Sequence, residues 1–333
     1  MKKRAVSVIG IFLLLSVFPI LDTLRASADH KERPANGQAV LWRAPADIRT
    51  RNLFYGPGGQ QSEPRGPFKF IKEDLGGTAA KFIIEDARKA RWKVKLGEEA
   101  RPETAATRLL WAVGYFTDVD YYMPRLRVAG MRPLSRGHKY VLRDGQVTQA
   151  RLELIENGSR KLDDWSWFDN PFIGTSQFNG LRVMMALMNN WDLKEVNNAI
   201  YVHEGREQRY VVSDLGATFG KTGGKWSRSK GDVGDYLESG FVEKVKPRTV
   251  DLTLHSRPPI LFAVHVPYYR ERTRMGKISD DIPRAHAKWI GNLLSQLSAK
   301  QIGDAFRAAG YSPLEVQHYS RKVQERIQQL EAL

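Results

Sequence analysis

Residues 192–197 read Asp-Leu-Lys-Glu-Val-Asn, and residues 214–216 read Asp-Leu-Gly. Between them, residues 199–202 and 209–213 are rich in β-branched and aromatic side chains and flank a polar turn, which predicts a β-hairpin. Because a hairpin returns the chain close to where it left, the two polar stretches are expected to lie near each other. An apolar stretch, residues 178–189, precedes them and predicts a buried helix.

The chain before this region is rich in predicted strands. Three short stretches of strand character predict an antiparallel meander, with Gly76-Gly77-Thr78 as its first turn. The three stretches are residues 68–72, 81–85 and 92–96. Apolar residues at helical spacing then predict a helix over 102–113, ended by Gly114, and residues 121–128 predict a further strand.

The chain after the hairpin is rich in predicted helices. Four apolar-periodic stretches carry this prediction: residues 259–264, 282–297, 299–309 and 313–330. Residues 131–170 are charged and irregular, with one hairpin expected around Asp144-Gly145. The predicted fold class is α+β, with a strand-rich N-terminal part and a helix-rich C-terminal part.

The first 28 residues have the three parts of a secretory signal peptide. Basic residues at 2–4 precede an apolar run over 8–21, and Ala26-Ser27-Ala28 predicts cleavage before Asp29. Pro19 and Asp22 interrupt the run, which is shorter than the ~20 residues that a membrane-spanning helix needs. We therefore expect export to the periplasm or the extracellular space, with no transmembrane segment in the mature chain.

The composition narrows the classes of function. The chain of 333 residues has no cysteine, which excludes disulfides, thiolate nucleophiles and cysteine-based metal sites. The sequence also lacks H-E-x-x-H and G-x-S-x-G, which disfavours metallohydrolases and α/β-hydrolases. A formal charge of +15 favours an anionic partner such as an envelope polymer, lipid headgroups or a phosphorylated ligand. A basic solubilising surface explains the charge equally well, and no nucleic-acid partner is expected.

The two polar stretches resemble the catalytic loop, D-L-K-x-x-N, and the metal-binding loop, D-F-G, of the protein-kinase-like superfamily. The resemblance implies that Asp192 is the catalytic base and that Lys194 stabilises developing charge. It implies further that Asn197 and Asp214 hold Mg²⁺ or Mn²⁺ against the phosphates of ATP. Trp191 stands where protein kinases have arginine, and the second loop has leucine in place of phenylalanine.

The N-terminal part extends the resemblance. Lys95 closes the third strand of the meander, as the nucleotide-binding lysine does in that superfamily, and Glu103 opens the next helix as its ion-pair partner. This helix is similar to the corresponding helix of secretory-pathway and HipA-type kinases. The turn Gly76-Gly77-Thr78 would cover the phosphates with backbone N–H groups. Lys93 shares a strand face with Lys95, so the choice between the two lysines stays open.

The resemblance implies a bilobal, protein-kinase-like fold in an atypical exported bacterial enzyme. After an irregular lead-in at 29–66, the expected parts are an N-lobe at 67–130, an interlobe segment at 131–170 and a C-lobe at 171–333. The implied activity is transfer of the ATP γ-phosphate to a hydroxyl of a protein, sugar or lipid.

Two other readings stay open. In one, the chain is a catalytically inactive kinase-like protein that binds or scaffolds other components of the cell envelope. In the other, the site residues have ordinary structural roles. Asp192 and Asn197 would then cap a turn, Asp214 would end a strand, Glu103 would complement a helix dipole and Lys95 would be solvated.

Overall fold

The structure is a computed structural model that describes residues 37–202, 207–222, 228–254 and 265–333. The described residues belong to one compact unit. The predicted signal peptide, residues 1–28, and the helix predicted at 259–264 lie outside the described residues. Within the described ranges, no helix combines the length and the apolar character needed to cross a membrane.

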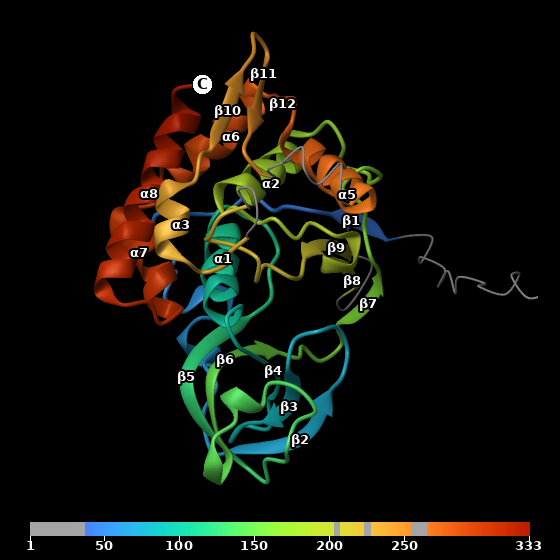
Figure 1. Cartoon of the computed structure of the whole chain (residues 1–333), viewed down its shortest axis with the longest axis vertical. Coiled ribbons are helices and arrows are strands. Elements are labelled where there is room, and N and C mark those ends of the chain that lie inside the picture. The colour runs from blue at the N-terminus through green and yellow to red at the C-terminus, as the bar shows by residue number, and fades with distance from the viewer. Residues whose placement is uncertain (1–36, 203–206, 223–227, 255–264) are drawn as a thin grey trace, which may run out of the picture. The chain divides into compact units, whose positions relative to one another are not determined.

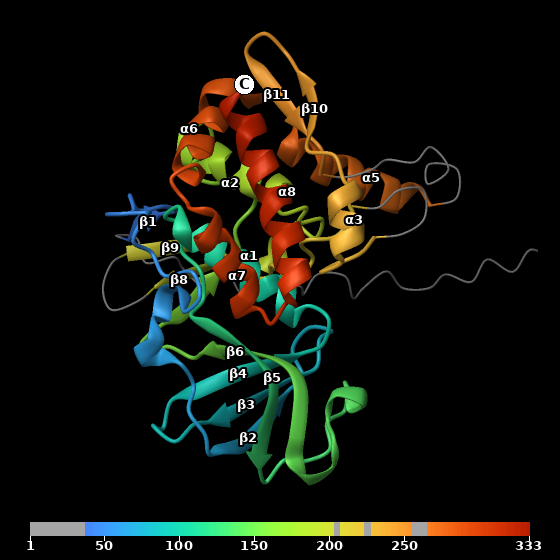
Figure 2. The same cartoon turned by 90° about the vertical axis from the view of Figure 1, so that its left-hand side faces the viewer.

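Five strands close into a barrel in the order β2-β3-β4-β6-β5. They are β2 (Phe68–Asp74), β3 (Lys81–Glu85), β4 (Arg91–Leu96), β5 (Asp120–Ala129) and β6 (Gln146–Leu154). Neighbours pair antiparallel, except that β2 and β5 close the barrel in parallel. Figures 1 and 2 show the barrel at the opposite end of the compact unit from β10 and β11.

The strand period of two decides which side chains of β4 lie inside the barrel. Trp92, Val94 and Leu96 are buried in the core of the barrel. Lys93 and Lys95 alternate with them and project from its outer surface. The barrel thus presents two lysines, two residues apart, toward the rest of the unit.

Helix α1 (Ala100–Ala112) contacts the outer surface of β5 and β6 on one side and α7 on the other. Nearly all of its residues are buried. Small side chains such as Ala105, Ala106 and Ala112 allow this close packing on several faces. Figure 1 shows α1 between the barrel and the C-terminal helices.

The remaining elements surround a larger hydrophobic core. A second sheet has the order β1-β9-β8-β7, and a third has the order β10-β11-β12. The strands are β1 (Gln38–Val40), β7 (Arg160–Asp163), β8 (Asn198–Val202), β9 (Glu207–Val212), β10 (Val242–Val245), β11 (Thr249–Leu252) and β12 (Ile282–Pro283). The helices are α2 (Ser176–Leu187), α3 (Val233–Glu238), α5 (Val266–Gly276), α6 (Arg284–Leu294), α7 (Ala299–Ala308) and α8 (Pro313–Glu331).

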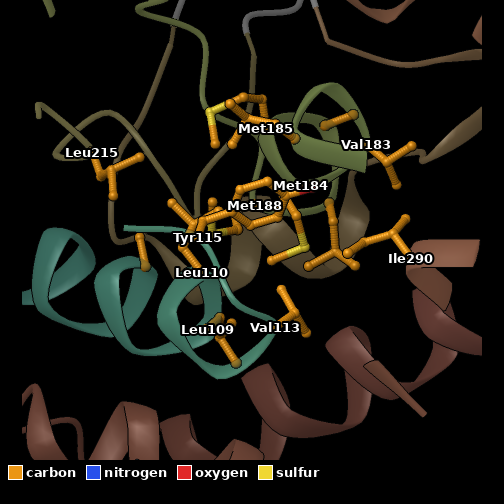
Figure 3. Close-up of a cluster of buried hydrophobic side chains, with 14 of the residues drawn as sticks. Leu109, Leu110, Val113, Tyr115, Val183, Met184, Met185, Met188, Leu215 and Ile290 are labelled. Carbon is orange, nitrogen blue, oxygen red and sulfur yellow. The ribbon is translucent and has the colours of Figure 1, made fainter. Parts of the chain in front are cut away.

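The larger core joins α1 and α2 to the polar loop after β9. Leu215 of the Asp-Leu-Gly stretch is almost fully buried in the same cluster as Leu110 and Met188. Figure 3 shows these three side chains in one cluster. Val183 and Ile290 lie on the side of the cluster opposite Leu215. Leucine at position 215 therefore anchors its loop to α1 and α2 by hydrophobic packing.

Most predicted elements are present, and the differences have local causes. The helix expected over 282–297 begins at Arg284, because Ile282 and Pro283 pair with β11 as β12. The segment expected to be irregular, residues 131–170, contains β6 and β7. Strand β6 is part of the barrel, so the barrel extends beyond the boundary predicted at residue 130. Helices α3 and α5 and the sheet β10-β11-β12 were not predicted from the sequence.

Candidate functional site

Lys95 is the centre of a cluster of charged side chains from three parts of the chain. Its Nζ lies 2.7 Å from Glu99 Oε2, 3.0 Å from Glu103 Oε2 and 3.2 Å from Asp214 Oδ1. Lys95 and Glu103 are buried, whereas the side chain of Asp214 is 40% exposed. One ammonium group therefore joins the barrel, α1 and the loop after β9.

The surrounding carboxylates hold Lys95 in its charged form. Burial disfavours the ammonium, but the negative charges of Glu103, Asp214 and Glu99 outweigh it and raise the pKa of Lys95. Burial would also raise the pKa of Glu99, yet Lys95 and Lys230 lower it to about 2. Lys230 Nζ lies 2.6 Å from Glu99 Oε1. At neutral pH this cluster therefore contains a cationic Lys95 and an anionic Glu99.

Local geometry brings these side chains together. Gly97, with φ of 109°, turns the chain directly after β4, and its carbonyl accepts a hydrogen bond from Ala100 N at 3.0 Å. This tight turn starts α1 so soon that Glu103 is in its first turn, above Lys95. Asp214 follows β9 and accepts a hydrogen bond from Gly216 N at 3.1 Å, which fixes one of its carboxylate oxygens.

The structure separates the two candidate lysines. Lys93 forms an ion pair with Glu153 of β6 and lines a cavity of about 240 Å³ with Asp118 and Tyr201. Within the described part of the chain, no hydrogen bond or ion pair joins Lys93 to Glu103 or Asp214. Lys95 therefore has the contacts that the resemblance implies for the nucleotide-binding lysine.

Asn197 links the two polar loops. Its Nδ2 donates a hydrogen bond to the carbonyl of Asp192 at 2.8 Å. Its own carbonyl accepts from Ser213 N at 2.8 Å and from Asp214 N at 3.2 Å. The hairpin β8–β9 thus brings the loops at 192 and 214 to one place, as its pairing requires.

The end of α2 sets the direction of the first loop. Arg326 of α8 is fully buried and donates a hydrogen bond to the carbonyl of Leu187 at 2.6 Å. Asn189, with φ of 54°, then turns the chain away from the helix. Asp192 emerges from this turn and forms an ion pair with Lys194, whose Nζ lies 3.0 Å from Asp192 Oδ1.

The glycine turn between β2 and β3 lies on the surface, unlike the buried side chains of Lys95 and Glu103. Gly76, Gly77 and Thr78 are exposed, and Gly76 N donates to Asp74 Oδ1 at 2.9 Å. Thr78 lines a cavity of about 360 Å³ together with Glu99 and Lys230. Across the described residues, no hydrogen bond or ion pair connects this turn to Lys95 or Asp214.

The oxygen donors at 197 and 214 suit a hard divalent cation bound together with phosphates. The described residues include no group of three or more His, Cys, Asp or Glu that could hold a metal ion. Mg²⁺ bound with nucleotide phosphates needs fewer protein ligands, because phosphates and water fill the other positions. Asp214 is partly exposed and can reach such an ion. The side-chain nitrogen of Asn197 donates to the carbonyl of Asp192, which leaves the side-chain oxygen of Asn197 for the ion.

Sequence reasoning missed the residues that support this cluster. Arg151 of β6 is buried, with its guanidinium 2.6 Å from Asp120, 2.8 Å from Glu153 and 3.5 Å from Glu103. Glu103 therefore contacts two cations, Lys95 and Arg151. Glu99 lies four residues after Lys95 and forms an ion pair with it. The sequence would have indicated this ion pair only if the turn at Gly97 had also been predicted.

No protein-family model and no curated protein matches this chain. Among solved structures, the Helicobacter pylori proinflammatory kinase CtkA is 10% identical with a TM-score of 0.44, over 79% of this chain and 96% of that chain. The Golgi casein kinase is also 10% identical, with a TM-score of 0.35, over 79% of this chain and 73% of that chain.

Proposed function

We propose that this chain is an atypical kinase-like phosphotransferase with a bilobal arrangement, which binds ATP with Mg²⁺ or Mn²⁺ and transfers the γ-phosphate to a hydroxyl. The observation that carries the proposal is the position of Lys95 between Glu103 and Asp214. A buried lysine held by a helix glutamate, next to a partly exposed aspartate, suits a site that receives phosphates and a metal ion.

The other site residues have matching functions in this proposal. Asp192 would accept the proton of the acceptor hydroxyl, whose oxygen then bonds to the γ-phosphorus while the bond from phosphorus to ADP breaks. Lys194, paired with Asp192, would balance negative charge that develops on the transferring group. Lys95 would bind phosphate oxygens, and Glu103 would keep Lys95 in position. The exposed backbone of Gly76, Gly77 and Thr78 would approach the phosphates only if the turn moved toward Lys95.

Asp214 and Asn197 would hold the divalent cation, which supplies positive charge that neutralises the phosphates when it is bound. In the free protein, Lys95 balances part of the negative charge of Asp214. Binding of the cation and the phosphates would therefore require Lys95 to change partners, from Asp214 to a phosphate oxygen.

Titration with ATP tests this proposal directly. Thermal unfolding of the purified chain is measured with ATP alone, with Mg²⁺ or Mn²⁺ alone and with both. We expect stabilisation by the pair that exceeds the sum of the separate effects, and Asp214→Ala should abolish that excess. Equal stabilisation of Asp214→Ala and the unchanged chain would refute the assignment of the metal ligands.

Export and the inactive alternative need separate measurements. N-terminal sequencing of the secreted protein would test cleavage before Asp29. A chain that binds the nucleotide but forms no ADP or phosphorylated product would be the binding or scaffolding protein described as the alternative. Asp192→Asn separates these cases further, because it should retain nucleotide binding while lowering any transfer rate by at least about 100-fold.

A further inference from the structure

Arg151 lies directly opposite Lys95 on the outer surface of the barrel. The register of β4 and β6 pairs these two residues, and it pairs Lys93 with Glu153 two positions away. Residues directly opposite on antiparallel strands have Cβ atoms about 4.5–5.5 Å apart, and like charges at such positions are destabilising. Lys93 and Glu153 have opposite charges and form an ion pair, whereas Lys95 and Arg151 repel each other. The position of Arg151 therefore requires an anion close to both cations.

Glu103 of α1 supplies this anion. Its Oε2 lies 3.0 Å from Lys95 Nζ, and its Oε1 lies 3.5 Å from Arg151 Nη1. The two oxygens of one carboxylate are thus divided between two cations. All three residues are buried, with relative exposures of 6% for Lys95 and 1% for each of the other two. Because water is nearly excluded, these charges act on one another more strongly than they would at the surface.

The guanidinium of Arg151 is held in place by three further carboxylates. Its Nε lies 2.6 Å from Asp120 Oδ2, its Nη1 lies 2.8 Å from Glu153 Oε2, and its Nη2 lies 3.3 Å from Asp118 Oδ2. Burial opposes the charged form, but Glu103 and these three carboxylates outweigh it and raise the pKa of Arg151. Asp120 and Glu153 belong to strands of the barrel. Arg151 is therefore a permanent cation whose position is fixed by the barrel.

Glu103 depends on this fixed cation when Lys95 binds phosphates. Burial raises the pKa of Glu103, the charges of Arg151 and Lys95 oppose the rise, and the charge of Asp214 adds to it. In the proposed function Lys95 turns toward a phosphate oxygen and shares its charge with the phosphates. A buried carboxylate without a cation is strongly disfavoured. Arg151 remains beside Glu103 in that state and lets the carboxylate keep its charge and its contact with Lys95.

We propose that Arg151 is a positioning residue, which holds the Glu103 carboxylate in place and thereby keeps Lys95 directed at the phosphates. This inference rests on the proposed function and adds a residue to its site from β6, a strand that contributes none of the residues placed there so far. Arg151 acts through Glu103 and does not touch the nucleotide. Its role requires its positive charge and not only its size.

The affinity for ATP with Mg²⁺, measured by calorimetry, tests the proposal. Arg151→Gln should weaken binding at least about tenfold, because Glu103 loses its second cation. Arg151→Lys keeps a positive charge and should bind within about threefold of the unchanged chain. Arg108→Gln is the matched control: both arginine side chains are 1% exposed, but Arg108 pairs with Asp120, and no ion pair among the described residues joins it to Glu103. Both glutamine variants should lose stability, but Arg108→Gln should bind within about threefold of the unchanged chain.

A double variant tests whether Arg151 acts through Glu103. Adding Arg151→Gln to Glu103→Gln should cause no further loss of affinity, because the carboxylate is already gone. Without nucleotide, the unfolding free energy of the double variant should fall by less than the sum of the two single losses. If Arg151→Gln does not fold, Arg151→Gln/Asp118→Asn replaces it, because one neighbouring carboxylate is then removed together with the cation. Asp118→Asn alone is its reference.

Four results would overturn the inference. They are equal nucleotide affinity of Arg151→Gln and the unchanged chain, binding by Arg151→Lys as weak as by Arg151→Gln, an equal loss in Arg108→Gln, and a further loss when Arg151→Gln is added to Glu103→Gln. Nucleotide binding that is independent of Arg151 would thus refute this inference alone. Coupling of Arg151 with Glu103 in the unfolding free energy, without any binding of ATP with Mg²⁺, would refute the proposed function and still support the link between these two residues.

Discussion

Lys95 Nζ lies 3.2 Å from Asp214 Oδ1, although the two residues are 119 positions apart in the chain. Lys95 belongs to the barrel and Asp214 to the loop that follows the hairpin β8–β9. Asp214 supplies one of three carboxylates that surround the Lys95 ammonium group. The other two belong to Glu99 and Glu103. Phosphates that enter here would compete with Asp214 for Lys95.

The first prediction distinguishes the two lysines of β4. Lys95→Met should weaken binding of ATP with Mg²⁺ at least about tenfold, because it removes a charge-assisted contact to a phosphate. Lys93→Met should have a much smaller effect, because Lys93 forms its ion pair with Glu153. Both affinities can be measured by calorimetry, with thermal unfolding as a check on folding. The opposite order of effects would show that Lys93 is the nucleotide-binding lysine.

The second prediction concerns the buried carboxylate of Glu103. Glu103→Gln removes a negative charge from between Lys95 and Arg151 and leaves two cations close together in a buried region. The free energy of unfolding should fall by about 3–5 kcal/mol, as measured by chemical denaturation. Glu98→Gln is the matched control, because its side chain is 68% exposed and lies 3.9 Å from Lys139. Similar losses in both variants would mean that the buried pair contributes little.

Local patterns were enough to predict the elements that carry Lys95 and Glu103. The alternation of β4 and the helical spacing after Gly97 are visible within a few residues each. The hairpin β8–β9 likewise indicated that the polar loops at 192 and 214 would meet. These predictions depend on short-range periodicity, which the sequence displays directly.

The missed elements depend on contacts between distant residues. Strand β6 has Ala150, Leu152 and Leu154 on its inner face, but Arg151 and Glu153 between them made the stretch resemble a polar loop. Arg151 and Glu153 can be buried in this strand only because residues of α1, β4 and β5 form ion pairs with them. Helix α5 was missed for a similar reason, since its buried side includes Arg272 and is not an apolar stripe.

The third prediction is a dependence of stability on pH. Lys95 and Lys230 overcome the effect of burial and lower the pKa of Glu99 from the model-compound value of 4.5 to about 2. A lowered pKa means that Glu99 contributes stability above about pH 4.5, and that this contribution is lost as the pH falls toward 2. The contribution is at most about 3–4 kcal/mol, because the pKa falls from 4.5 to about 2 and one pKa unit corresponds to about 1.4 kcal/mol.

The difference in unfolding free energy between the unchanged chain and Glu99→Gln isolates this effect from other titrating carboxylates. Measured by denaturation at several values, the difference should be constant from pH 7 to 5 and shrink between pH 4.5 and 2. A difference that stays the same down to pH 2.5 would contradict the ion-pair origin of the lowered pKa.

The fourth prediction concerns the close approach of Gly216 to Glu99. A Cβ atom at Gly216 would lie 2.7 Å from Glu99 Cβ and 2.9 Å from its Cγ, so Gly216→Ala must displace Glu99. We expect a loss of about 1–3 kcal/mol in unfolding free energy and weaker binding of ATP with Mg²⁺, because Glu99 also positions Lys95. Gly234→Ala is the control, since its Cβ would meet Asp232 at an ordinary 3.5 Å.

A second substitution identifies the cause of this loss. Glu99→Gly removes the three atoms that would lie nearest to the new Cβ, and glycine is tolerated at the residue preceding α1. The double variant Glu99→Gly/Gly216→Ala should therefore be more stable than the sum of the two single losses predicts, with a coupling of at least about 1 kcal/mol. Additive losses would place the strain elsewhere in the loop, and Gly216 would then have no part in holding Glu99 against Lys95.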